Sequence, residues 1–259
     1  MTGGHALPAN GAPTRAVTTA VHARGACART LADALIRRAP RPIIKVCGVR
    51  TPEIAADVAD AGADLIGVNF AQISKRRTDP DTAHRITRAL RAKSSTAGRT
   101  PLVVGIFVEQ SAAQIAAIAS EVGLDAVQLS GECTPSACID AHVSSHLPVV
   151  AVIRLGASND VARAKALAAA EGVAAVLVDA PNTVGGAGHA WNHSQARAVV
   201  DALALVGMGV IVAGGLHEGN VRAALESSGA WGADVASGVE TGGMTDAERV
   251  RAFVQAARG

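Results

Sequence analysis

From residue 43 to its end, the chain alternates about eight times between a short β-branched run and an Ala-rich stretch whose apolar positions recur at helical spacing. The runs are apolar throughout, which is typical of parallel strands covered on both faces. Parallel strands need long crossovers, and the helical stretches supply them. The expected strands are residues 43–47, 64–70, 102–107, 126–129, 149–153, 174–178, 210–213 and 233–236, with helices that include residues 52–61, 82–91, 112–122 and 161–170.

This alternation predicts an α/β fold, a single (β/α)8 TIM barrel of about 215 residues. The competing architecture is a doubly wound sheet, which usually has fewer strands and a GxGxxG fingerprint after its first strand. The chain lacks that fingerprint.

Residues 1–41 differ in composition from the rest of the chain. They are rich in Ala, Pro, Gly and Arg and contain one acidic residue, Asp33. We expect a partly flexible extension with a short helix at residues 30–38, followed by the catalytic barrel over residues 42–259. The arginines also fit a transit peptide, whereas the apolar core of a secretory signal is missing.

Charge and aromatic content restrict the class of partner. The 259 residues include 24 basic and 22 acidic ones, and aromatic residues make up 2% with no Tyr. These numbers predict neither a strongly basic surface that would attract nucleic acid nor aromatic side chains on which its bases would stack. The most apolar long stretch, residues 199–216, is interrupted by Asp201 and by glycines that include Gly207, Gly209 and Gly214, so it predicts a helix end and a buried strand rather than a membrane span. We therefore expect a small-molecule partner, no nucleic acid and no membrane.

Four cysteines, Cys27, Cys47, Cys133 and Cys138, have neither CxxC spacing nor the density of a disulfide scaffold. This pattern indicates a reducing compartment, the cytoplasm, and predicts no metal site.

Two reactive side chains follow expected strands at the end where barrels carry their active sites. Cys47 ends the first strand, where it fits either a small buried apolar residue or a functional thiol. Asp179 follows the apolar run of the sixth strand, and a carboxyl there is harder to explain by packing.

Glycine-rich turns follow the last three strands. Such turns let backbone N–H groups converge on an anion, and the loops after strands seven and eight commonly hold phosphate in barrels. The candidate phosphate-binding residues are Gly185, Gly186, Gly188, Gly214, Gly215, Ser237 and Gly238.

Short segments from about residue 44 onward match one family in order, and on them the chain resembles the phosphoribosylanthranilate isomerases of tryptophan biosynthesis, a branch of aromatic amino-acid biosynthesis. The matching segments are Lys45-Val46-Cys47-Gly48, Gly62-Ala63-Asp64, Ile66-Gly67, Ser74-Lys75-Arg76, Val104-Gly105-Ile106-Phe107-Val108, Val127-Gln128-Leu129, Val178-Asp179, Gly185-Gly186-Ala187-Gly188, Ala213-Gly214-Gly215-Leu216, Asn220-Val221 and Asp234-Val235-Ala236-Ser237-Gly238-Val239-Glu240.

The resemblance implies an aldose–ketose isomerase. It would convert N-(5-phosphoribosyl)anthranilate to 1-(2-carboxyphenylamino)-1-deoxyribulose 5-phosphate by an Amadori rearrangement, without a cofactor, as a monomer or homodimer. By the same resemblance Asp179 is the general acid at the furanose oxygen and Cys47 the general base at C2. A thiol must be partly ionised to act as a base, and a nearby positive charge such as Lys45 or Arg76, or the developing iminium, would favour this. Arg76 would also lie near the anthranilate carboxylate, although a solvated charge in a basic run fits it equally well.

The resemblance also places Gln128 and Ser130 in substrate binding, and here the chain departs from the family. Ser130 replaces the usual His of a Gln-Leu-His-Gly pattern. Further departures are Asn69, Glu109, Ala187, Ala236 and the segment Trp191-Asn192-His193, and His189 after the glycine loop has no assigned role. These changes fit either neutral sequence drift or a substrate with a different arylamine. Two alternatives therefore stay open. One is a paralogous isomerase of specialised metabolism, and the other is a non-catalytic phosphosugar-binding barrel.

Overall fold

Eight parallel strands pair in chain order and close into a barrel, because β8 returns to pair with β1. The computed structural model describes residues 42–97, 100–179 and 193–259, so the expected extension and its helix at residues 30–38 lie outside the described residues. The strands are β1 (Ile43–Cys47), β2 (Leu65–Asn69), β3 (Leu102–Phe107), β4 (Ala126–Leu129), β5 (Val149–Arg154), β6 (Val173–Asp179), β7 (Gly209–Ala213) and β8 (Gly232–Val235).

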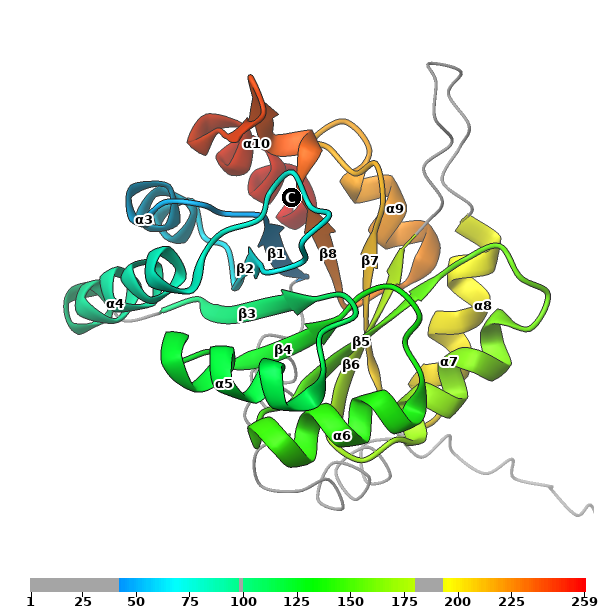
Figure 1. Ribbon diagram of the computed structural model, residues 1–259. Coiled ribbons are helices and arrows are strands. Elements are labelled where there is room, and N and C mark those ends of the chain that lie inside the picture. Colours follow the sequence, from blue (N-terminus) through cyan, green and yellow to red (C-terminus); the bar gives the residue numbers. More distant parts are fainter. Residues whose placement is uncertain (1–41, 98–99, 180–192) are drawn as a thin grey trace, which may run out of the picture.

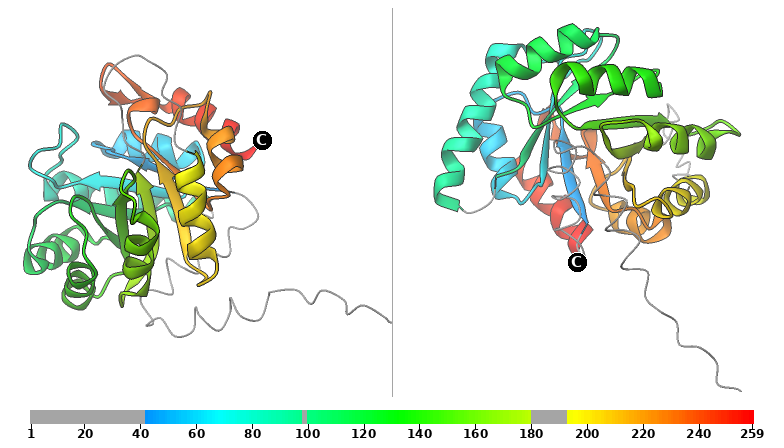
Figure 2. Two further views of the ribbon diagram at one scale, coloured as in Figure 1. Left: turned by 90° about the vertical axis from the view of Figure 1, so that its right-hand side faces the viewer. Right: turned by 90° about the horizontal axis from the view of Figure 1, so that it is seen from below.

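Helices follow the strands and surround the barrel (Figures 1 and 2). They are α3 (Pro52–Asp60), α4 (Pro80–Ala97), α5 (Ala112–Val122), α6 (Pro135–Ser145), α7 (Asp160–Ala169), α8 (His193–Ala204), α9 (Val221–Ser228) and α10 (Ala247–Arg258). A short 3₁₀ helix η1 (Ser237–Val239) and a hairpin of β9 (Glu240–Thr241) and β10 (Met244–Thr245) lie between β8 and α10. The (β/α)8 prediction is confirmed.

Some predicted boundaries are wrong, and side chains explain two of them. The second strand begins at Leu65 rather than at residue 64, where the Asp64 carboxylate accepts a hydrogen bond from the Ile44 N–H at 2.9 Å. Helix α4 begins at Pro80 because Asp79 accepts the Thr82 N–H at 2.8 Å, which satisfies a donor of the first turn.

Two apolar layers stabilise the barrel. The inner layer fills the interior of the barrel, and Trp231, the residue before β8, packs against it. A Cβ on Gly209 would lie 2.6 Å from the Trp231 ring, so only glycine admits this indole. The outer layer joins the strands to the helices.

A buried ion pair holds the last helix to the first two strands. Arg258 of α10 donates to the Asp64 carboxylate at 2.7 Å and to the Gly62 carbonyl at 2.9 Å. The same carboxylate oxygen accepts the Ile44 N–H of β1. No helix among the described residues is both long enough and apolar enough to cross a membrane.

Candidate active site

Cys47 ends β1 beside a buried ion pair. Lys45, two residues earlier on the same face of β1, is fully buried and donates to the Asp234 carboxylate of β8 at 2.8 Å. The two residues are register partners in the β1–β8 ladder. Since side chains two apart point to the same side of a strand, the thiol lies directly above this pair on the interior face.

The three groups change one another's ionisation. Burial raises the pKa of the Cys47 thiol, while Lys45 and Arg76 act in the opposite direction and Asp234 adds to the rise. Burial also raises the pKa of Asp234, against the attraction of Lys45. Burial alone would lower the pKa of Lys45, but Asp234 and Cys47 outweigh it and raise the value. Lys45 therefore stays charged, and Cys47 rests as a thiol.

Two glycines leave the space that the Cys47 and Arg76 side chains occupy. A Cβ on Gly67 of β2 would lie 3.3 Å from the Cys47 sulfur and 3.1 Å from its Cα. A Cβ on Gly48 would lie 2.4 Å from the Arg76 Cδ, and Gly48 has a φ of +83°, in the left-handed region that disfavours other residues. Arg76 thus passes over the residue that follows the thiol.

Arg76 is held by a carboxylate rather than left in solvent. Its Nε and Nη2 donate to the two carboxylate oxygens of Glu240 at 2.5 and 2.8 Å. This two-point geometry fixes the plane of the guanidinium, and both side chains are mostly buried. The interpretation of Arg76 as a solvated charge is therefore wrong.

Asp179 is the last residue of β6 and lies beside Arg154, its register partner at the end of β5. The Arg154 Nε lies 3.7 Å from the Asp179 carboxylate, and the Arg154 side chain is 77% exposed. Burial raises the pKa of Asp179, Arg154 opposes this rise, and Asp234 adds to it. Because Asp234 acts on both Asp179 and Cys47, one buried carboxylate links the electrostatics of the two sides of the mouth.

Gln128 and Ser130 lie together at the end of β4. The Gln128 Nε2 donates to the Ser130 Oγ at 3.1 Å. The Gln128 Oε1 is buried, and the described part of the chain offers it no hydrogen-bond donor. The Ser130 hydroxyl thus accepts a hydrogen bond from the Gln128 side-chain nitrogen, while the Gln128 side-chain oxygen remains available as an acceptor.

The glycine turns after β7 and β8 pack on one another. A Cβ on Gly238 would lie 1.9 Å from the Leu216 carbonyl oxygen, so this approach of two backbones requires glycine. Gly214 and Gly215 have positive φ values of 99° and 61°. Gly215 and Ser237 are exposed, which leaves this corner open to an anion. Gly185, Gly186, Gly188 and His189 lie outside the described residues.

The sequence did not single out Asp234, Glu240 or Arg154 as site residues, although each partners a candidate. The available signal was a charged side chain in or just after an otherwise apolar strand. In the described ranges, no group of three or more His, Cys, Asp or Glu side chains has the arrangement of a metal site.

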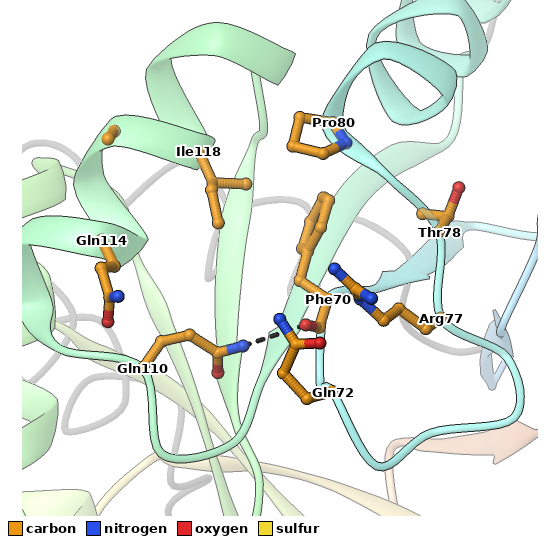
Figure 3. Close-up of a pocket in the computed structure, with 9 residues that line it drawn as sticks. Phe70, Gln72, Arg77, Thr78, Pro80, Gln110, Gln114 and Ile118 are labelled. Atoms are coloured by element: carbon orange, nitrogen blue, oxygen red, sulfur yellow. Dashed lines mark hydrogen bonds between the residues drawn. The ribbon is translucent and has the colours of Figure 1, made fainter.

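A separate groove of about 260 Å³ lies between the β2–α4 loop and α5 (Figure 3). Phe70, Pro80 and Ile118 give it an apolar wall, and Gln110 donates to the Phe70 carbonyl at 2.9 Å. Arg77 lines this groove, whereas its neighbour Arg76 pairs with Glu240. None of the predicted site residues lines it.

The chain is similar to known proteins over most of its length. Residues 44–256 match the family described as N-(5'phosphoribosyl)anthranilate (PRA) isomerase. An N-(5'-phosphoribosyl)anthranilate isomerase from Roseiflexus sp. (strain RS-1) is 36% identical over 217 residues, which cover 83% of this chain and 97% of the relative.

Two solved structures are similar over 83% of this chain and 98% of their own. One contains monomers of a dimeric phosphoribosylanthranilate isomerase from Thermotoga maritima, with a TM-score of 0.69 and 27% identity. The other is a phosphoribosylanthranilate isomerase in complex with reduced 1-(o-carboxyphenylamino)-1-deoxyribulose 5-phosphate, with a TM-score of 0.66 and 26% identity.

Proposed function

Since this chain belongs to the phosphoribosylanthranilate isomerase family, we propose that Asp179 and Cys47 are the acid and the base with which it isomerises N-(5-phosphoribosyl)anthranilate. The observation that carries the proposal is the position of a carboxyl and a thiol at the ends of β6 and β1, both influenced by Asp234. Acid and base chemistry suffices for this rearrangement, so the proposed steps need no cofactor.

Asp179 opens the sugar ring. Its protonated carboxyl donates to the furanose oxygen, the bond from that oxygen to C1 breaks, and the nitrogen lone pair forms an iminium. Burial raises the pKa of Asp179, which favours the protonated form that this step needs. The carboxylate left behind pairs with Arg154 and the new cation.

Cys47 then removes a proton. Once the thiol has released its own proton to solvent, the thiolate takes the proton from C2, and the electron pair moves into the C1–C2 bond, giving an enolamine that tautomerises to the ketone. The resting thiol has a raised pKa, so a cation is needed to favour ionisation; Lys45 and Arg76 supply two, and the iminium a third. A thiolate formed against burial is also a stronger base.

The remaining groups hold the substrate. Glu240 contacts Nε and Nη2 of Arg76, so the Nη1 edge would pair with the anthranilate carboxylate. A sugar hydroxyl would satisfy the buried Gln128 Oε1, with Ser130 completing that wall. Backbone N–H groups of Gly214, Gly215, Ser237 and Gly238 would bind the phosphate, together with Gly185, Gly186 and Gly188.

The experiment is a fluorescence assay of phosphoribosylanthranilate consumption with wild type, Cys47→Ser and Asp179→Asn. We expect each variant to lose about 10²–10⁴-fold in kcat while folding and binding substrate, because each removes one proton-transfer group. Cys133→Ser, which changes a half-buried thiol that the proposed reaction does not use, is the matched control and should keep its kcat. Near-normal kcat in either test variant contradicts the assignment.

Growth rescue of a tryptophan auxotroph that lacks this isomerase tests the activity in cells.

We further propose residues 1–41 as an extension, residues 42–259 as the catalytic barrel, a cytoplasmic location, and a monomer or homodimer. Light scattering coupled to size-exclusion chromatography distinguishes the two assemblies.

A further inference from the structure

The start of helix α6 contains two cysteines that the proposed reaction does not use. Thr134 caps the helix, its Oγ1 accepting the Ala137 N–H at 3.2 Å, and Pro135 is the first helical residue. Cys133 immediately precedes the cap, and Cys138 is the fourth residue of the helix. In this pair of positions, two apolar side chains commonly pack on each other and fix the direction in which the chain enters the helix.

Here two thiols occupy these positions. Their sulfur atoms lie 3.3 Å apart. Cys138 has no exposed surface and belongs to the core between barrel and helices, and Cys133 packs against that core while remaining partly exposed. The fold therefore holds one accessible and one enclosed thiol in contact, at a separation that a small side-chain movement closes to a bond.

The two thiols are also electronically unequal. Acceptance of a hydrogen bond from the Cys138 thiol lowers the pKa of Cys133, helped by the Val152 N–H and opposed by burial. The same hydrogen bond raises the pKa of Cys138, and burial raises it further. Cys133 is thus the thiol that ionises first, and it is also the one that a reagent in solution can reach.

We propose that Cys133 and Cys138 are a reversible dithiol–disulfide site whose oxidant is a small disulfide of the glutathione type. The Cys133 thiolate attacks one sulfur of the oxidant and releases one glutathione thiolate, forming a mixed disulfide. Cys138 then loses its proton to solvent, and its thiolate attacks the Cys133 sulfur and releases the second glutathione. Two protein thiols are oxidised and one small disulfide is reduced to two thiols.

The bond would close the loop that follows the candidate substrate-binding end of β4. The Cys133 N–H donates to the Gly131 carbonyl at 3.1 Å, and Gly131, directly after Ser130, has a φ of +95°. A disulfide therefore ties this turn to the first turn of α6. Backbone amides of residues 131–138 should exchange with solvent more slowly in the oxidised protein.

The test uses the full chain with Cys27→Ser and Cys47→Ser, which leaves only these two of its four cysteines. Incubation with oxidised glutathione should lower the mass by about two units, as two hydrogens leave, and remove both titratable thiols. Dithiothreitol should restore both. In the same background, Cys138→Ala should stop at a glutathione adduct on Cys133.

A digest of the oxidised wild-type chain checks the result without substitutions that affect folding. The peptide that contains both Cys133 and Cys138 should carry the mass loss, with neither Cys27 nor Cys47 attached. Two thiols that remain free, a glutathione adduct that persists in the presence of Cys138, or bridges to Cys27 or Cys47 would each overturn the proposal.

Discussion

The two sides of the barrel mouth are built differently. On the base side, β1 and β8 carry Cys47 above the buried Lys45–Asp234 pair, and Glu240 holds Arg76 at two points. On the acid side, the cation that the described residues place beside Asp179 is Arg154, at 3.7 Å and with 77% of its side chain exposed.

This difference indicates that the groups around Cys47 tolerate substitution less well than the groups around Asp179. A thiol buried beside charges works as a base only if those charges stay in place, and short, buried, directional pairs keep them there. The acid side instead has the longer 3.7 Å contact of Arg154 with Asp179. The end of β4, which pairs with β5, adds the Ser130 departure from the family pattern and a Gln128 oxygen that has no donor among the described residues. We infer that changes to the charged groups around Cys47 cost stability and turnover together, and that changes to the groups around Asp179, but not to Asp179 itself, alter substrate preference or pH dependence.

The largest expected effect comes from breaking the buried pair. Lys45→Met leaves the Asp234 carboxylate buried without its cation, which should lower the unfolding free energy by about 3–5 kcal/mol. The double variant Lys45→Met/Asp234→Leu removes both charges and should recover much of that loss in chemical denaturation. Its turnover should stay low, because Lys45, one of the two side-chain cations that favour the Cys47 thiolate, is gone. A single variant as stable as wild type would show that the base side does not depend on this pair.

Replacement of Ser130 by His tests whether the acid side tolerates change. If the pocket suits anthranilate, kcat/KM for its phosphoriboside should be good in wild type and change little in Ser130→His. A pocket reshaped for another arylamine would give poor wild-type activity that Ser130→His raises, by up to the roughly 1–3 kcal/mol that one pocket contact contributes. The ratio of kcat/KM values for the two proteins decides between these outcomes.

A smaller change should follow from removing the loose cation of the acid side. Arg154 acts to lower the pKa of Asp179, so Arg154→Met should raise that pKa further and move the Asp179-dependent limb of the kcat/KM profile to higher pH. Titration of the Asp179 carboxyl carbon by NMR, identified by its absence in Asp179→Asn, measures the shift directly. An unchanged pKa would mean that the 3.7 Å pair has no electrostatic effect in solution.

The raised pKa of Asp179 also has a consequence for stability. A carboxyl whose pKa is higher in the folded than in the unfolded protein destabilises the fold once pH exceeds the folded value. Asp179→Asn should therefore be more stable than wild type above that pH, and the advantage should vanish below the carboxyl's unfolded pKa. Thermal unfolding of both proteins across pH tests the sign, and equal stability at every pH would contradict it.

The smallest effect should come from the segment that leads into the base side. A chain that begins near residue 41 keeps β1 and every candidate residue of the site, so its kcat should stay within about a few-fold of wild type. Steady-state kinetics of the shortened, folded protein provide the check. A folded protein without activity would contradict this prediction and indicate that residues 1–41 close over the site or complete an oligomer interface.

Pattern and spacing predicted the barrel because eight apolar runs and their crossovers are local features. They also placed Cys47 and Asp179 at strand ends. Pairings across the barrel could not be predicted that way, since Asp234 and Glu240 meet Lys45 and Arg76 only through closure. The Glu109 departure from the family pattern affects the backbone. Glu109 has a φ of +67°, a conformation that the usual Asn tolerates better.

The closure of the barrel also determines when the site can exist. Lys45 and Asp234 are 189 positions apart in the chain, and Asp64 and Arg258 are 194 apart. Contacts of such long range carry a large loop-closure entropy and form late in folding. An open, partly folded barrel would therefore hold a lysine without its counter-ion and a thiol without the electrostatics of a base. Completion of the fold and onset of catalytic competence would then be a single kinetic event.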